Sequence, residues 1–65
     1  MTSIEAVKLL KIIRQADGGC SYCASNLALD LFRDFPYVDW ITAISEIDEG
    51  DRNPFLSALE GKVYD

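Results

Sequence analysis

The segment from residue 18 to residue 35 places the strongest constraint on the fold, because it combines a double glycine, the only two cysteines and a regular apolar pattern. Its apolar positions recur every three or four residues, as on one face of a helix. They are Cys20, Cys23 or Ala24, Leu27, Ala28, Leu31 and Phe35. We therefore expect a helix here, starting at residues 19–21, whose apolar face is covered by the rest of the chain.

Helices are also expected before and after this segment. Thr2-Ser-Ile-Glu5 fits a capping box, and Asp17-Gly-Gly is a typical helix end, so the sequence predicts a first helix over residues 3–16. Pro36 ends the second helix, because the residue before a proline avoids helical dihedral angles, and it suits the first position of a third helix. The side chains of that third helix expected in the core are Tyr37, Trp40, Ile41, Ile44 and Ile47.

The last part of the chain predicts one short helix. Asn53-Pro54 reads as a cap followed by proline at the first helical position, and Gly61 as a stop, so residues 55–60 form the fourth helix. The sequence thus predicts an all-α fold, a compact bundle of three to four short helices that forms a single domain over residues 1–65. The alternative is an α+β fold in which the C-terminal residues 62–65 form a short strand.

The charge of the chain is unevenly distributed. The formal net charge is −5, and residues 1–33 sum to +1 whereas residues 34–65 sum to −6. A negative field of this kind repels nucleic acid and attracts basic surfaces, including those of proteins that bind nucleic acid. The expected partner is therefore a basic nucleic-acid-binding protein, with no direct contact to nucleic acid.

An acidic surface is the main candidate for a partner-binding site. Asp39, Glu46 and Glu49 fall on the outer face of the third helix as the sequence predicts it, and neighbouring carboxylates extend this face. The whole candidate set is Asp30, Asp34, Asp39, Glu46, Asp48, Glu49 and Asp51. Such a surface could imitate the phosphates of a DNA backbone; the alternative is that it only keeps the protein soluble.

The Cys20-Ser-Tyr-Cys23 motif admits three interpretations. A zinc site needs four ligands, and a chain without histidine supplies two, so only a dimer that joins two cysteine pairs could complete one. A thioredoxin-like redox motif follows a strand, whereas a helix precedes this one. The third interpretation is two reduced thiols that pack the start of the second helix against the first. We expect no metal otherwise and no cofactor, since Asp48, Asp51 and Asn53 lack the ligand spacing of a calcium loop.

The sequence does not predict an enzyme. The chain contains no histidine, and its paired carboxylates are not accompanied by a nucleophile. A pocket enclosed within 65 residues would also remove packing that so small a core needs. Because no targeting segment or membrane-length apolar run is visible, we expect a cytoplasmic monomer with no membrane contact.

A compact, acidic, single-domain chain of this length resembles the small phage-encoded inhibitors, in particular type I anti-CRISPR proteins. The segment Asp17-Gly-Gly-Cys-Ser-Tyr-Cys23 is also similar to one found in small phage and bacterial proteins. The anti-CRISPR resemblance implies an inhibitor that occupies the basic DNA- or PAM-binding surface of a Cascade-type effector complex by DNA mimicry. Anti-CRISPR proteins share no common motif, so it assigns no role to single residues. The alternative function is a thiol module, either a zinc-bridged dimer or a small redox protein, that works through Cys20 and Cys23.

Overall fold

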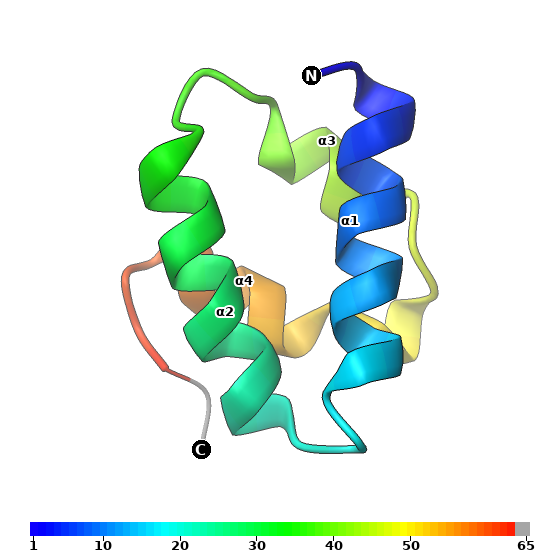
Figure 1. The fold of residues 1–65 in the computed structure, drawn as a ribbon, viewed down its shortest axis with the longest axis vertical. Coiled ribbons are helices and arrows are strands. Elements are labelled where there is room, and N and C mark those ends of the chain that lie inside the picture. The colour runs from blue at the N-terminus through cyan, green and yellow to red at the C-terminus, as the bar shows by residue number, and fades with distance from the viewer. Residues whose placement is uncertain (64–65) are drawn as a thin grey trace.

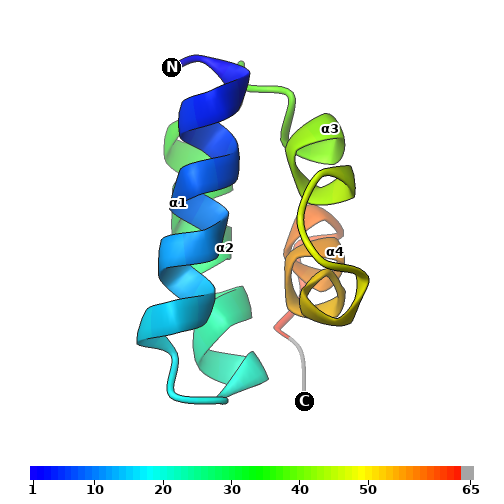
Figure 2. The same ribbon diagram turned by 90° about the vertical axis from the view of Figure 1, so that its right-hand side faces the viewer.

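The computed structural model describes residues 1–63, which form four α-helices and one short 3₁₀ helix. The elements are α1 (Ser3–Ala16), α2 (Ser21–Asp34), α3 (Trp40–Ser45), η1 (Glu49–Asp51) and α4 (Asn53–Leu59). α1 and α2 run antiparallel in one layer, and α3 and α4 lie in a second layer behind them (Figure 1, Figure 2). The predicted all-α class is confirmed. The described residues contain no strand, and Tyr64 and Asp65 of the tail considered for one lie outside them.

α1 has the bounds that its sequence predicts. The Thr2 hydroxyl accepts a hydrogen bond from the Glu5 N–H at 3.1 Å, and the Glu5 carboxylate accepts one from the Thr2 N–H at 2.8 Å. The hydrogen bond from the Thr2 N–H to the carboxylate, and next the interaction of the carboxylate with the Thr2 hydroxyl, lower the pKa of Glu5. At the other end, Gly18 and Gly19 both have positive φ, which lets the chain turn sharply into α2.

α2 packs mainly on α4 through small side chains. Ala24, Ser25 and Ala28 of α2 are buried, as is Ala58 of α4, so the two helices can approach closely. Leu27 was predicted on this face, but half of its surface is exposed. The reason is that the small residues define the contact line, which leaves Leu27 on the flank of the helix.

α3 is shorter than the sequence predicts, because it begins at Trp40 and not at Pro36. The Asp39 carboxylate accepts a hydrogen bond from the Thr42 N–H at 3.1 Å and therefore caps the helix. The Trp40 indole N–H donates to the Phe35 carbonyl at 2.9 Å, which holds residues 36–38 as a turn. Trp40 is buried as expected, whereas Tyr37 (73% exposed) and Ile41 (70% exposed) were wrongly predicted in the core.

The core lies between the two layers and is built mainly from aliphatic side chains together with Trp40 and Phe55. Leu10 of α1, Ile44 of α3 and Phe55 of α4 are its largest fully buried apolar residues. Pro54 lies in the first turn of α4 and Gly61 follows its end with positive φ, as expected. Asn53, predicted as the cap of this helix, is instead its first residue, and Arg52 occupies the cap position without a side-chain cap bond.

Candidate functional site

The N-terminus of α2 brings the two cysteines together. Cys20 occupies the cap position with an extended backbone, and its sulfur accepts a hydrogen bond from the Cys23 N–H at 3.0 Å. In this arrangement the Cα atoms of Cys20 and Cys23 are 5.2 Å apart, within the range of disulfides. The chain folds this way because the Gly18-Gly19 turn delivers an extended residue at the point where the helix begins.

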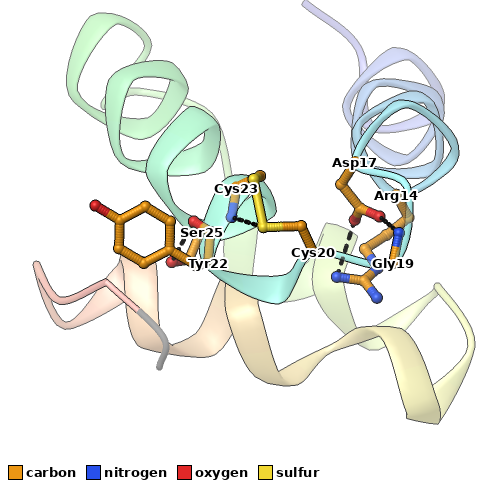
Figure 3. The surroundings of a disulfide bond; sticks show 7 residues. All are labelled: Arg14, Asp17, Gly19, Cys20, Tyr22, Cys23 and Ser25. Carbon is orange, nitrogen blue, oxygen red and sulfur yellow. Dashed lines mark hydrogen bonds and ion pairs between the residues drawn. A yellow bond between two sulfur atoms is a disulfide. The ribbon is translucent and has the colours of Figure 1, made fainter.

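Cys20 and Cys23 form a disulfide bond, which corrects the prediction of two reduced thiols (Figure 3). The related prediction, that both thiols pack α2 against α1, is also wrong for Cys23, whose residue is exposed, while Cys20 is half-buried. The spacing of three residues across the first helical turn places the two side chains next to each other, so they can form a disulfide within this turn.

Asp17 supports this turn from the end of α1. Its carboxylate accepts a hydrogen bond from the Gly19 N–H at 2.7 Å, and its backbone carbonyl accepts one from the Cys20 N–H at 3.0 Å. The Asp17 side chain is fully buried and forms an ion pair with Arg14 at 3.0 Å (Figure 3). Burial of a carboxylate is costly unless a cation accompanies it, and Arg14 fills that role here.

The segment from residue 48 to residue 53 is a structural connection. η1 occupies its centre, and Asp51 reaches Arg14 at 3.6 Å. Arg52 donates hydrogen bonds to the Ile47 carbonyl at 3.1 Å and the Ser45 carbonyl at 2.8 Å, and so satisfies the C-terminal end of α3. Within residues 1–63 no three histidine, cysteine, aspartate or glutamate side chains gather in a way that could hold a metal ion.

Both arginine roles were missed by the sequence analysis. The sequence analysis assigned no contact to Arg14 or to Arg52. The sequence carries one usable signal, since Arg14 precedes Asp17 by three residues and such pairs meet on a helix surface. Nothing in the sequence indicates that Arg14 also reaches Asp51.

Asp39 is exposed, as predicted, but its carboxylate also caps α3. The Thr42 hydroxyl donates to its carboxylate at 2.7 Å in addition to the Thr42 N–H. These hydrogen bonds, the one from the hydroxyl first, lower the pKa of Asp39. Part of its acceptor capacity is therefore already used for starting α3.

The other acidic residues fall into two groups on different sides of the molecule. Asp30 and Asp34 lie on the exposed face of α2. Glu46, Asp48, Glu49 and Asp51 lie at and after the end of α3, on the far side of α1 from α2 (Figure 1, Figure 2). The structure therefore does not bring the seven carboxylates of the prediction together into one continuous face.

Basic residues of α1 lie close to the second acidic group. Glu46 borders the same hollow as Lys8 and Lys11, and Asp48 and Asp51 border a groove that contains Lys11 and Arg14. The outer face of α1 thus meets the acidic end of the molecule directly. Local attraction between these groups reduces the field that the carboxylates project into solvent.

An apolar groove lies between α3 and α4, where Trp40, Ile41 and Leu59 contribute to its wall. Tyr37 is exposed nearby in the chain and makes an edge-on ring contact with Phe35, with centroids 6.1 Å apart. The predicted third helix had placed Tyr37 and Ile41 inside. Their exposure is the largest difference between the predicted and the observed surface.

Comparison with protein-family models, curated proteins and solved structures found no match to this chain. Among the described residues, none of the helices has the length and apolar content needed to cross a membrane.

Proposed function

We propose that the protein is a thiol–disulfide exchange module that works through Cys20 and Cys23. The observation that supports this proposal is the position of Cys20, which caps a 14-residue helix and accepts the Cys23 N–H at its sulfur. Helix N-termini stabilise anions, and the thiolate is the nucleophilic form of cysteine. A cysteine at a helix N-terminus is therefore more reactive than a free one. Cys23 is exposed in the first turn, where the thiol of a partner has access to it.

The exchange reaction follows from the position of Cys20 at the helix cap and the exposure of Cys23. A partner thiolate attacks the sulfur of Cys23, the bond between Cys23 and Cys20 breaks, and Cys20 leaves as a thiolate held by the helix amides. A second thiol of the partner then attacks the partner's own sulfur in the mixed disulfide and releases Cys23. Two electrons and two protons pass from the partner dithiol to the protein, and the partner leaves as a disulfide. The reverse sequence oxidises Cys20 and Cys23 and reduces the partner.

Single-cysteine variants test this assignment. In Cys20→Ser the internal thiol that resolves a mixed disulfide is absent, so a stable mixed disulfide on Cys23 should accumulate with a linear disulfide peptide, whose other half leaves as a free thiol. In Cys23→Ser the mixed disulfide should form more slowly, because the remaining thiol is half-buried. Intact mass after acid quenching measures both. A protein that carries two thiols after mild oxidation, or variants that form no mixed disulfide, would contradict the proposal.

The zinc-bridged dimer is the other form of a thiol module, and it makes an opposite prediction. It requires reduced cysteines and two chains for each metal ion. Metal analysis together with the mass in solution separates the two forms: a zinc-containing dimer whose metal loss accompanies oxidation supports the bridge, and a metal-free monomer supports exchange.

A second candidate function is an inhibitory protein-binding module with an acidic surface, as in the anti-CRISPR hypothesis. The supporting observation is that Asp30, Asp34, Glu46, Asp48 and Glu49 are exposed. Their carboxylates form no ion pair or side-chain hydrogen bond with the described residues. Carboxylates without internal partners are available to a basic protein surface.

Charge reversal can test this second candidate one acidic group at a time. Asp30→Lys with Asp34→Lys alters the α2 group, and Glu46→Lys with Glu49→Lys alters the group beyond α3. The probe is a purified type I Cascade complex, with binding of its target DNA as the readout. DNA mimicry would be supported, and the surface located, if one double variant lost inhibition while its circular dichroism was unchanged. Inhibition by the parent protein should also weaken steeply as salt is added. Equal inhibition by both variants and the parent protein would contradict it.

A further inference from the structure

A charged groove lies beside the disulfide. It is formed by the end of α1, the glycine turn and the η1 region, and it encloses about 350 Å³. The residues that define it are Lys11, Arg14, Asp17, Gly19, Asp48 and Asp51. Gly19 is the residue before Cys20, and the close-up view shows it together with Arg14 and Asp17, with the disulfide to one side of this group (Figure 3). Neither cysteine lines the groove, which therefore begins one residue before the disulfide.

The charges of the groove do not cancel. Arg14 forms ion pairs with both Asp17 and Asp51, so one cation serves two carboxylates. Asp48 is exposed and has no ion pair with a described residue, and Lys11 is the other cation of the groove. Three carboxylates against two cations leave the groove negative, and the net charge of the chain is −5.

No closer charge competes with this groove along the chain. Residues 18–29 contain no charged side chain, so the glycine turn and the first two turns of α2 contribute only the partial positive charge of the helix N-terminus. Charges at the opposite end of the bundle act weakly, because Glu5 is about 18 Å from Asp17 along α1 and the Debye length is about 8 Å at physiological ionic strength. Along the chain, the charged side chain nearest to the disulfide is therefore that of Asp17, which belongs to the groove.

We propose that the natural exchange partner of the disulfide is a protein cysteine flanked by lysine or arginine, and that Asp48 and Asp51 of the groove select it. This inference rests on the exchange function proposed above. A cationic flank is attracted into the groove, whereas an acidic flank is repelled both there and by the net charge of the molecule. The exposed carboxylate of Asp48 is the specificity-determining group, since Asp51 is partly engaged with Arg14.

The test uses two blocked tripeptides, Lys-Cys-Lys and Glu-Cys-Glu, as reductants of the intact oxidised protein. Two peptide thiols reduce one Cys20–Cys23 disulfide to two thiols and leave as one peptide disulfide, so no further reductant is needed. Each rate is divided by the rate of the same peptide with the uncharged reagent hydroxyethyl disulfide, which removes differences in thiol reactivity. The corrected rate of the basic peptide should exceed that of the acidic peptide by about fivefold at 0.1 M salt.

Matched variants locate the effect. Asp48→Asn removes one negative charge from the groove and should reduce the preference to about twofold. Glu5→Gln removes the same charge from the far end of α1 and keeps a capping box, since glutamine also serves at that position. It should leave the preference unchanged.

The outcomes separate this inference from the proposed function. A corrected rate ratio near one overturns the role of the groove while exchange itself stands. So does a ratio that falls equally in Asp48→Asn and Glu5→Gln. If neither peptide reduces the disulfide, the exchange function fails and this inference fails with it. A ratio that falls with Asp48→Asn alone and declines as salt is added supports both.

Discussion

α2 and α3 begin with the same hydrogen-bond pattern but with different atoms. Asp39 caps α3 with a carboxylate oxygen, which accepts the Thr42 N–H at 3.1 Å. Cys20 caps α2 with a sulfur, which accepts the Cys23 N–H at 3.0 Å. Sulfur is a weak acceptor, and cysteine is not among the residues that favour this position. Two helices of one small protein thus begin with an oxygen cap and a sulfur cap.

The weak cap is compensated from outside the helix. Asp17 fixes the backbone before α2 by accepting hydrogen bonds from the Gly19 and Cys20 amides. Arg14 neutralises the charge of the Asp17 carboxylate. α3 has no such external support, and its own cap and the Trp40 bond hold its start. The difference indicates that the start of α2 depends on Asp17 and Arg14 as well as on its own cap.

The largest expected effect tests this external support. Asp17→Asn keeps an oxygen for the Gly19 N–H but removes the charge that Arg14 pairs with in a buried site. Leaving a buried cation with a weaker partner should reduce the free energy of unfolding by about 3 kcal/mol, a large share of the stability of a domain this small. Urea unfolding followed by circular dichroism measures it.

Glu60→Gln is the control for that variant, because it removes an exposed ion pair, Lys62 to Glu60 at 3.9 Å. Its cost should stay within about 0.5 kcal/mol. If Asp17→Asn costs no more than Glu60→Gln, the turn does not depend on the buried pair, and the contrast between α2 and α3 is lost.

An intermediate effect is expected when the sulfur cap is replaced by oxygen. Under reducing conditions Cys20→Ser should be more stable than the parent protein by about 0.5 kcal/mol, because a serine hydroxyl is a preferred cap. Without reductant the order should invert, since the parent protein regains its disulfide, which contributes about 2 kcal/mol for a loop this short. Cys23→Ser, which loses the disulfide but keeps the sulfur cap, should be the least stable of the three. Equal stability of both serine variants would show that the cap atom is unimportant.

The smallest effect concerns pH. Hydrogen bonds from Thr42 lower the pKa of Asp39 in the folded protein, so the unfolded chain binds a proton at this site at higher pH than the folded one. This contribution to stability is present above the ordinary pKa range of aspartate and is lost as pH falls through the lowered value. Replacing Asp39 with serine, which does not titrate, should reduce the fall in melting temperature between pH 7 and pH 3 by a few degrees. Disulfide-bonded Cys20 does not titrate, so the start of α2 should add nothing to this pH dependence.

The local signals in the sequence predicted most of the fold. The capping box at Thr2 and the glycines after Asp17 gave the bounds of α1, because both signals act within one turn of the chain. The start of α3 was wrong because proline at 36 and an apolar period from Tyr37 to Ile47 imitate a longer helix. A competing local signal was present, since Asp39 stands three residues before Thr42, and tertiary contacts of Trp40 decided between the two.

The site was less predictable, because it depends on residues far apart in the chain. Counting charges shows that the second half of the chain is acidic, but it does not show which basic residues lie beside these carboxylates in the fold. Lys11 and Asp48, for example, border one groove although they are 37 residues apart in the sequence. The same holds for Arg14 and Asp51. The sequence identified Cys20 and Cys23 as a motif, but it could not show that the chain presents them at a helix start with one sulfur half-buried and the other residue exposed.

The position of Trp40 gives the protein an optical reporter that is separate from its sulfur chemistry. The indole is buried and makes a tilted ring contact with Phe32, with ring centroids 4.9 Å apart. Phe32 is nine residues beyond Cys23, or about 14 Å along α2, too far for the disulfide to quench the indole by contact. Fluorescence of this single tryptophan should therefore follow the packing of α3 and remain silent when the disulfide is reduced. Folding and redox state can then be followed in one sample by independent signals.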